Sequence, residues 1–208
     1  MSKFLPKWKV RHAEHNYIKW LYNWPLRATK ESEIQKGLVE SGVTVDPDVS
    51  SVFEVGCGAC TNLELVSQLM PNLTLMGNDI AYDSIIKNVD KELISKIDIM
   101  GVDTETLFAT RVFHPDLFMS IDHSMHLDDK TVAKMLNKID NEWCPKYVLI
   151  REANKTTSTS DENSLCPRLG HDYNLPSYEM IYDEKSACLP KKTMQEGFFY
   201  FIRVFKRK

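Results

Sequence analysis

No stretch of the 208-residue sequence approaches the roughly 20 uninterrupted apolar residues that a membrane span requires. The first residues, MSKFLPKWKVRHAEH, also lack the apolar run of a secretory signal. The formal net charge is only −3 with both signs mixed, so the chain lacks the long basic face of a protein that follows nucleic-acid phosphates. These absences predict a soluble, cytoplasmic protein with neither a membrane nor a nucleic acid as its partner.

The cysteines lack the pattern of a disulfide framework. Five cysteines are an odd number, which indicates free thiols in a reducing compartment. Cys57 and Cys60 form a CxxC pair, but no second Cys or His pair at metal-ligand spacing accompanies them, so the pair does not indicate zinc. Asp122, His123 and His126 could together hold a divalent ion, although such ions favour a site richer in carboxylates. We therefore predict no metal site.

Short apolar runs alternate with stretches of helical periodicity from Ser51 onward. The segments between the runs, TNLELVSQLM, AYDSIIKNVDKELI and KTVAKMLNKID, repeat their apolar residues at helical spacing. This alternation is typical of βαβ units, so it predicts a parallel sheet with helices on both faces. The five predicted strands are residues 51–55, 73–78, 97–101, 117–121 and 147–152.

Two further strands are predicted near the end of the sequence, from YEMIYDEKS and EGFFYFIRVFKRK, with a turn around Leu189 to Glu196. Such a connection makes them an antiparallel hairpin beside the parallel strands. The predicted fold class is therefore α/β: a doubly wound, seven-stranded, mainly parallel sheet with a C-terminal antiparallel hairpin and helices on both faces.

The first 50 residues differ from the rest because aromatic side chains crowd a basic segment there. The following KESEIQKGLVESG predicts a short helix ending near Gly42. We expect two units, an N-terminal aromatic helical segment (1–50) and the α/β domain (51–208). The first unit could close over a ligand as a lid, or it could pack on the edge of the sheet. Its aromatic residues are Trp8, Tyr17, Trp20, Tyr22 and Trp24.

A glycine turn joins the first predicted strand to the following helix in SVFEVGCGACTNLELV. Gly56 and Gly58 suit a tight strand-to-helix turn because glycine adopts unusual backbone angles and lets a ligand approach the main chain. Backbone amides at the start of the helix then present positive partial charge, which favours a carboxylate or a phosphate. The segment therefore predicts a ligand site.

Nine residues of this turn resemble the first motif of class I S-adenosylmethionine-dependent methyltransferases. They read Glu54-Val55-Gly56-Cys57-Gly58-Ala59-Cys60-Thr61-Asn62. The resemblance implies S-adenosylmethionine as the cofactor, bound by Glu54, Gly56, Cys57 and Gly58. The carboxylate of Glu54 would repel a pyrophosphate but can accept a hydrogen bond from the cationic amino group of methionine. Cys60 departs from the motif, because such families commonly have a third glycine there.

The same resemblance implies cofactor-binding roles for residues at the ends of the next three strands. Asp79 in MGNDIAYDSI, beside Ile80, resembles the acid that binds both ribose hydroxyls, with helix capping as the alternative. Asp103 in IMGVDTETL, with Thr104, resembles the residue that meets the adenine amine, and helix capping is again the alternative. Asp122 in PDLFMSIDHSMHL resembles the position beneath the methionine part of the cofactor. Polar residues at these carboxyl ends match where open α/β sheets bind ligands.

Candidate catalytic residues come from the same segment after the fourth strand. His123 and His126 are predicted general bases, because imidazole titrates near neutral pH and the segment should face the acceptor. The alternative is that they pack against or cap the next helix. His171 and Tyr173 lie where this fold often inserts acceptor-recognition elements, so they are secondary candidates, with a structural role in a turn-rich loop as the alternative.

The predicted function is S-adenosylmethionine-dependent methyl transfer to an unidentified acceptor, expected to be a small molecule. Arg11 or Arg27 could reach the methionine carboxylate. No Asn-Pro-Pro-Tyr, Asp-Pro-Pro-Tyr or Pro-Cys follows the fourth strand, so the signatures of DNA methyltransferases are missing. One alternative is a catalytically silent S-adenosylmethionine-binding module. The other is a nicotinamide-dependent oxidoreductase, which Glu54 and the terminal hairpin disfavour.

Overall fold

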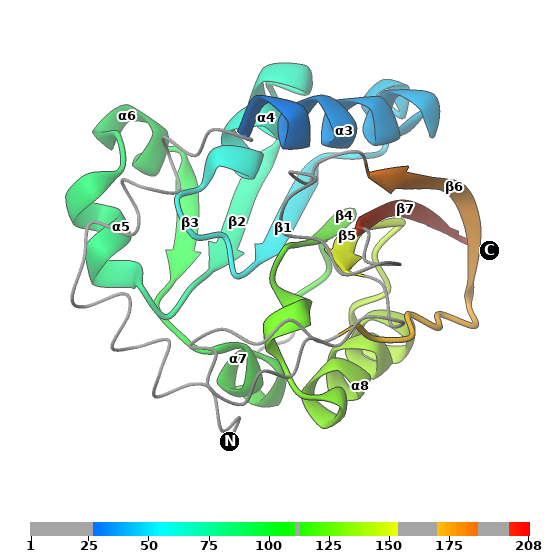
Figure 1. The fold of residues 1–208 in the computed structure, drawn as a ribbon. Helices are drawn as coiled ribbons and strands as arrows, with labels where there is room; N and C mark the ends of the chain where they lie inside the picture. Colours follow the sequence, from blue (N-terminus) through cyan, green and yellow to red (C-terminus); the bar gives the residue numbers. More distant parts are fainter. Residues whose placement is uncertain (1–26, 111–112, 154–169, 187–199) are drawn as a thin grey trace, which may run out of the picture.

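The computed structural model describes residues 27–110, 113–153, 170–186 and 200–208 (Figure 1). A seven-stranded sheet has the order β3-β2-β1-β4-β5-β7-β6. Strands β1 to β5 are mutually parallel, and β7 runs antiparallel to both β5 and β6. The predicted fold class is therefore confirmed. The strands are β1 (Ser51–Val55), β2 (Thr74–Asn78), β3 (Ile97–Met100), β4 (Leu117–Ile121), β5 (Tyr147–Ala153), β6 (Tyr178–Ser186) and β7 (Tyr200–Arg207).

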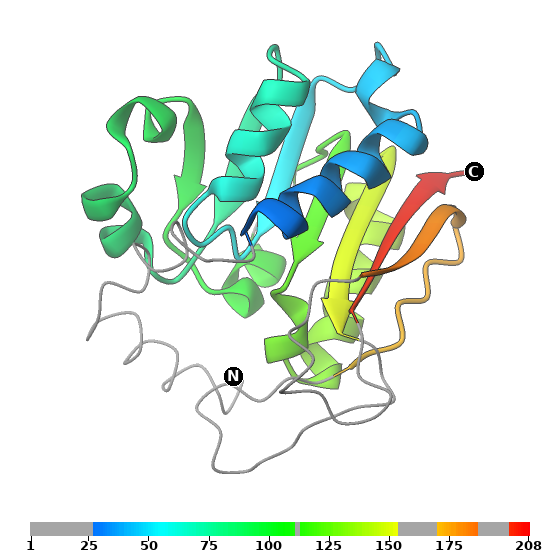
Figure 2. The ribbon, with the colours of Figure 1, turned by 45° about the horizontal axis from the view of Figure 1, so that its top comes forward.

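Helices cover both faces of the sheet (Figure 2). One face carries α3 (Arg27–Glu40), α4 (Thr61–Leu69), α5 (Tyr82–Asn88) and α6 (Lys91–Ile94). The opposite face carries α7 (Thr104–Thr110) and α8 (Asp129–Lys138), which a turn of π-helix continues to Trp143. The sheet is thus the middle layer of three.

Each face of the sheet has its own apolar core, because successive side chains of a strand point in opposite directions. In β1, Val52 belongs to the core beneath α3 and α4, whereas Phe53 belongs to the core beneath α7 and α8. The second core is rich in aromatic rings: buried Trp143 lies with its ring centroid 5.2 Å from that of Phe108 and 5.9 Å from that of Phe118. Together the cores hold the carboxyl ends of β1 to β5 in fixed relative positions.

Several helices differ from the prediction. The segment AYDSIIKNVDKELI forms two helices, because Val89 is extended and the Asp90 side chain caps α6 by accepting hydrogen bonds from the amides of Glu92 and Leu93. Helix α7 follows β3, where the sequence analysis indicated a helix only through the capping alternative for Asp103. The helix predicted before Gly42 begins earlier, at Arg27, and ends at Glu40.

The predicted division of the chain at residue 50 stays a prediction. Helix α3 buries Ile34 and Leu38 in the core shared with the sheet. The aromatic residues between Trp8 and Trp24 and the turn expected at 189–196 lie outside the described residues. Within the described ranges, none of the helices combines the length and the apolar character needed to cross a bilayer.

Candidate functional site

The turn after β1 requires glycine for two physical reasons. Gly56 and Gly58 have positive φ angles of 66° and 51°, in the left-handed region that favours glycine. A Cβ on Gly56 would also lie 2.0 Å from Nδ1 of His123, so only glycine lets this imidazole ring approach the turn. The turn after β1 and the segment after β4 therefore meet at Gly56.

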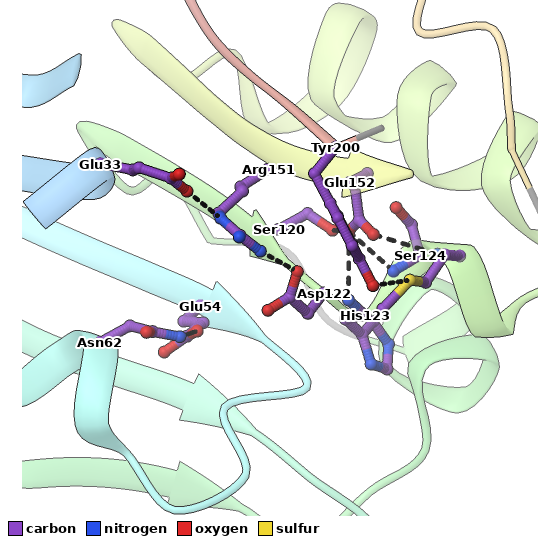
Figure 3. Close-up of polar contacts among 11 residues, drawn as sticks. Glu33, Glu54, Asn62, Ser120, Asp122, His123, Ser124, Arg151, Glu152 and Tyr200 are labelled. Atoms are coloured by element: carbon purple, nitrogen blue, oxygen red, sulfur yellow. Dashed lines mark hydrogen bonds and ion pairs between the residues drawn. The ribbon is translucent and has the colours of Figure 1, made fainter. Parts of the chain in front are cut away.

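Glu54 is the most unusual group in this turn, since its side chain is completely buried at the end of β1 (Figure 3). Its Oε1 accepts a 2.6 Å hydrogen bond from Nδ2 of Asn62, in the first turn of α4. Neither Glu54 Oε2 nor Asn62 Oδ1, both buried, has a hydrogen-bond partner among the described residues. Two acceptor atoms, on side chains that hydrogen-bond to each other, thus lack a donor among the described residues.

The electrostatic setting of Glu54 is also unusual. Burial raises the pKa of Glu54 to about 8, because the carboxylate loses its hydration, and the nearby charges of Asp79 and Asp122 raise it further. The hydrogen bond from Asn62 and the charge of Lys30 act in the opposite direction. A cation placed among these carboxylates would relieve their mutual repulsion.

Asp79, the predicted ribose-binding acid, stands at the end of β2 and faces the glycine turn. Its Oδ2 accepts a hydrogen bond from the amide of Gly58 at 2.9 Å, and its Oδ1 accepts one from the amide of Ala81 at 2.8 Å. Ala81, which has no side-chain cap, precedes α5, so Asp79 does not cap that helix. Each carboxylate oxygen keeps a second lone pair for a ligand. Ile80, its predicted companion, is half-buried.

Asp103 performs the capping role that the sequence analysis left open. Its carboxylate accepts hydrogen bonds from the amide and the hydroxyl of Thr106, at 2.8 Å and 3.0 Å, at the start of α7. Thr104 is buried, and its hydroxyl lies 2.8 Å from Nε2 of His123. The His123 ring therefore lies between Gly56 and Thr104, two residues predicted to bind the cofactor.

Asp122 is held by the strand beside it. Its φ of 55° is left-handed, and its amide donates to the carbonyl of Arg151 on β5 at 2.8 Å. Nη1 of Arg151 forms an ion pair with Asp122, and its Nε donates to Glu33 of α3 at 3.1 Å. Arg151 is only 1% exposed and lies over the Tyr200 ring, 4.8 Å from its centroid. This network connects α3 to the end of β4 (Figure 3).

Glu152, the next residue of β5, lies against the short helix η2 (Ser124–His126) and is completely buried. Its Oε1 accepts hydrogen bonds from the Ser120 hydroxyl at 2.8 Å and from the amides of His123 and Ser124 at 3.2 Å and 2.9 Å. Its Oε2 accepts from the amide of Met125 at 3.2 Å. Burial raises the pKa of Glu152 to about 7. The carboxylate thus receives three consecutive backbone amides.

The remaining predicted residues around η2 have mixed outcomes. His126 is half-buried on η2 itself. His171 and Tyr173 are buried and hold Ser124: Nε2 of His171 lies 3.0 Å from the Ser124 carbonyl, and the Tyr173 hydroxyl lies 2.7 Å from the Ser124 hydroxyl. Nδ1 of His171 lies 2.8 Å from Asp129 of α8. These contacts of His171 and Tyr173 agree with the alternative hypothesis, in which the two residues have a structural role, because both pack against η2.

Of the two basic residues considered for the methionine carboxylate, Arg27 begins helix α3. Nη2 of Arg27 donates to Glu64 of α4 at 2.8 Å, and its Nε pairs with Glu31. Arg11 lies outside the described residues. Arg27 therefore joins α3 to α4 within the described part of the chain.

The two thiols of the turn, Cys57 and Cys60, are buried and free, with their Sγ atoms 3.9 Å apart. The hydrogen bond with Cys60 and then burial raise the pKa of the Cys57 thiol well above its usual value. Cys60, which departs from the glycine of the motif that the turn resembles, adopts a left-handed φ of 59° immediately before α4. Within the ranges described, no three His, Cys, Asp or Glu side chains are grouped as a metal site would require.

Sequence reasoning named neither Arg151 nor Glu152 as part of the site. Both stand at the carboxyl end of a predicted buried strand, where charged residues are uncommon, and that position was the available signal. Asn62 belongs to the glycine motif. Its pairing with Glu54 makes it a member of the site.

Comparisons with known proteins agree with this geometry at the level of the fold. In sequence comparisons, no protein-family model and no curated protein matches the chain. The N-methyltransferase NodS from Bradyrhizobium japonicum, solved with S-adenosyl-L-homocysteine, is 12% identical with a TM-score of 0.62, over 88% of this chain and 89% of NodS. Magnesium protoporphyrin IX methyltransferase (ChlM) from Synechocystis PCC 6803, solved with S-adenosylmethionine, is 12% identical with a TM-score of 0.61, over 100% of this chain and 92% of ChlM.

A third solved structure, mitomycin 7-O-methyltransferase MmcR, is 12% identical with a TM-score of 0.58. The match covers 97% of this chain, but the chain spans only 60% of the length of MmcR. These likenesses, together with the strand order, show that the chain has the fold of class I S-adenosylmethionine-dependent methyltransferases.

Proposed function

We propose that this protein binds S-adenosylmethionine at the carboxyl ends of β1 to β4 and transfers its methyl group to a small molecule. The observation that carries the proposal is the pair of buried acceptors without a donor, Glu54 Oε2 and Asn62 Oδ1, beside the glycine turn. An ammonium group supplies several donors and a positive charge, so the amino group of a methionine suits both atoms. A pyrophosphate would meet two acceptors, one of them an oxygen of the Glu54 carboxylate, which disfavours a nicotinamide dinucleotide.

The other predicted positions complete the cofactor site along the same edge of the sheet. Gly56, Cys57 and Gly58 would present the main chain of the turn to the ligand, with the His123 ring packed against Gly56. In the proposal Asp79 and Ile80 bind the ribose, Asp103 and Thr104 the adenine, and Asp122 the methionine part. Three carboxylates in this small region, those of Glu54, Asp79 and Asp122, favour a ligand with a sulfonium and an ammonium charge.

The chemistry places modest demands on the protein. The bound sulfonium supplies the electrophilic methyl group, and the chain has to hold an acceptor in line with it and take up a proton where the acceptor loses one. His123 and His126 are the proposed bases. His123 touches Gly56 and Thr104, so it would combine this role with contact to the cofactor.

Calorimetric binding of S-adenosyl-L-methionine and S-adenosyl-L-homocysteine to the purified protein tests the proposal. The E54Q variant should bind both about 10-fold to 100-fold more weakly, since a hydrogen bond to a charged group contributes about 1.5–3 kcal/mol. The matched control is E92Q, a substitution at an exposed glutamate that pairs with Lys96. Failure of the wild type to bind either nucleoside at millimolar concentration, or unchanged binding by E54Q, would contradict the proposal.

Binding alone does not separate an enzyme from a silent binding module. Transfer of a radiolabelled methyl group from the cofactor to pooled metabolite fractions, with macromolecular fractions in parallel, makes that distinction. We expect label in a small-molecule fraction and its loss in the H123A H126A double variant. Tight cofactor binding without transfer to any fraction would identify the silent module instead.

A further inference from the structure

The segment after β4 is fixed from two sides by consecutive residues of β5. The Arg151 guanidinium forms an ion pair with the Asp122 carboxylate, and the Arg151 carbonyl accepts a hydrogen bond from the Asp122 amide. Glu152 points to the opposite face of the sheet, because strand side chains alternate, and there it accepts the amides of residues 123, 124 and 125. Arg151 and Glu152 together therefore accept hydrogen bonds from the backbone amides of four successive residues, 122 to 125.

We propose that Glu152 is a positioning residue, whose carboxylate orients the segment from His123 to Met125 and so holds the His123 imidazole against Gly56 and Thr104. The proposal rests on the proposed function only in assigning Gly56 and Thr104 to the cofactor. The contact itself is tight, since the space at Gly56 that a Cβ would fill contains the His123 ring. A small rotation of the segment would therefore move the ring either into the turn or away from it.

The contacts explain why a carboxylate stands at this position. Only an ionised carboxylate offers acceptors alone on both oxygens, which lets it receive the three amides and the Ser120 hydroxyl together. When protonated, it carries a donor and accepts more weakly. A glutamine in its place would turn an amide NH₂ toward one or more of these donors. The orientation of the segment should therefore depend on the ionisation of Glu152.

Other titratable groups surround the turn, and a test has to separate them from Glu152. Imidazoles as a class titrate near neutral pH, in the range to which burial raises the Glu152 pKa. Burial keeps the Tyr173 phenol neutral in that range by raising its pKa well above the usual value. The groups are Asp122, His123 and His126 after β4, Asp129 on α8, Arg151 on β5, His171 and Tyr173 beyond β5, and Tyr200 and Arg203 on β7.

Amide NMR shifts over a pH titration test the proposal without a cofactor. In the wild type, the amides of His123, Ser124 and Met125 should move together with one midpoint near pH 7, and E152Q should lose this shared step. An internal control is the amide of Ser51, bonded to Asp116, whose pKa is lowered by its hydrogen bonds. If the three amides titrate independently, or keep the shared step in E152Q, the proposal is overturned.

Binding of 5′-methylthioadenosine connects this positioning to function. This probe has no amino-acid part, so the titration of Glu54 does not affect it directly. E152Q should bind it about tenfold more weakly than the wild type at pH 8, with the two affinities converging below pH 6. A purely structural loss would instead keep E152Q weaker than the wild type at every pH. Equal binding at pH 8 would overturn the functional part of the inference. A shared amide step in a wild type that binds no sulfur nucleoside would instead support the positioning and sink only the proposed function.

Discussion

The turns after β1 and after β4 lie side by side at one edge of the sheet, and each is built around a completely buried glutamate. Glu152 receives four hydrogen bonds from the protein, whereas Glu54 receives one, from Asn62, and keeps an oxygen without a donor within the described residues. Their pKa values follow this difference, about 7 for Glu152 and about 8 for Glu54. Equal burial with fewer donors leaves the charged form less stable.

The comparison separates a residue that organises the fold from one that awaits a ligand. A buried acceptor without a donor costs free energy, so the fold retains it only if another purpose offsets that cost. Glu152 offsets its burial within the protein by holding the segment after β4. Glu54 lacks such compensation in the described structure, which is why we assign it to the cofactor.

The sharpest test of this difference is the stability of the two alanine variants. E152A leaves three amides and a hydroxyl without their acceptor, at about 1–3 kcal/mol for each donor that stays unsatisfied. We therefore expect the free energy of unfolding to fall by about 3–5 kcal/mol, measured by urea denaturation at pH 7.5. E54A leaves only the Asn62 side-chain amide without its acceptor and also removes a buried carboxylate. The free energy of unfolding should therefore fall far less in E54A than in E152A. Equal losses would remove the distinction.

The pH dependence of stability gives a second test, with a definite sign. The folded protein binds the Glu54 proton more tightly than the unfolded chain, because the pKa is raised from 4.5 to about 8. The corresponding stability is present below pH 4.5 and is lost as the pH rises to about 8. E54Q should avoid this loss, which amounts to at most about 5 kcal/mol, and raise the melting temperature at pH 8.5.

The opposite signs of these effects make E54Q informative in two assays. The same variant should melt higher at alkaline pH and bind the cofactor more weakly, as expected where a functional group is kept at a cost to stability. Glu152 also has a raised pKa, from 4.5 to about 7, so its contribution declines over the lower part of the same range. An E54Q variant that melts below the wild type at pH 8.5 would show that Glu54 is compensated in a way not seen here.

The contact between the two turns provides the third test, with the smallest expected effect. G56A forces a side chain into left-handed backbone and against the His123 ring, which lies 2.0 Å from the new Cβ. G42A is a matched control, because Gly42 has a φ of 77° but no atom within 4 Å of its Cβ position. G42A should cost about 1 kcal/mol, and G56A about 2 kcal/mol more. Thermal denaturation of both variants measures the difference, and equal costs would show that the ring yields freely.

Most of the fold was predictable because its signals are local. The buried strands are nearly continuous apolar runs, so each of the five parallel strands was predicted with ends within a residue of those observed. Helix α7 was indicated only by the capping alternative for Asp103, because its seven residues, TETLFAT, are too few to show a helical period. The break between α5 and α6 depends on capping by Asp90, a signal that the apolar periodicity concealed.

The site was predictable only in the part that a local motif encodes. Gly56 and Gly58 follow Glu54 closely in the sequence, and the unusual backbone angles of these glycines were anticipated. Glu152 and Arg151 act on residues about 30 positions earlier in the chain, and these pairings exist only once β4 and β5 lie side by side. The roles of His171 and Tyr173 were equally non-local, because they are set by Ser124.

The position of β7 bears on how the protein is made. This strand is the last one in the described sequence, yet it lies between β5 and β6. During synthesis from the N-terminus, β5 and β6 emerge from the ribosome well before their common partner, so the backbone groups at the edge of β5 stay open to other chains meanwhile. A premature stop codon before Tyr200 would leave that edge exposed permanently, and such a product should aggregate instead of folding as a shortened domain.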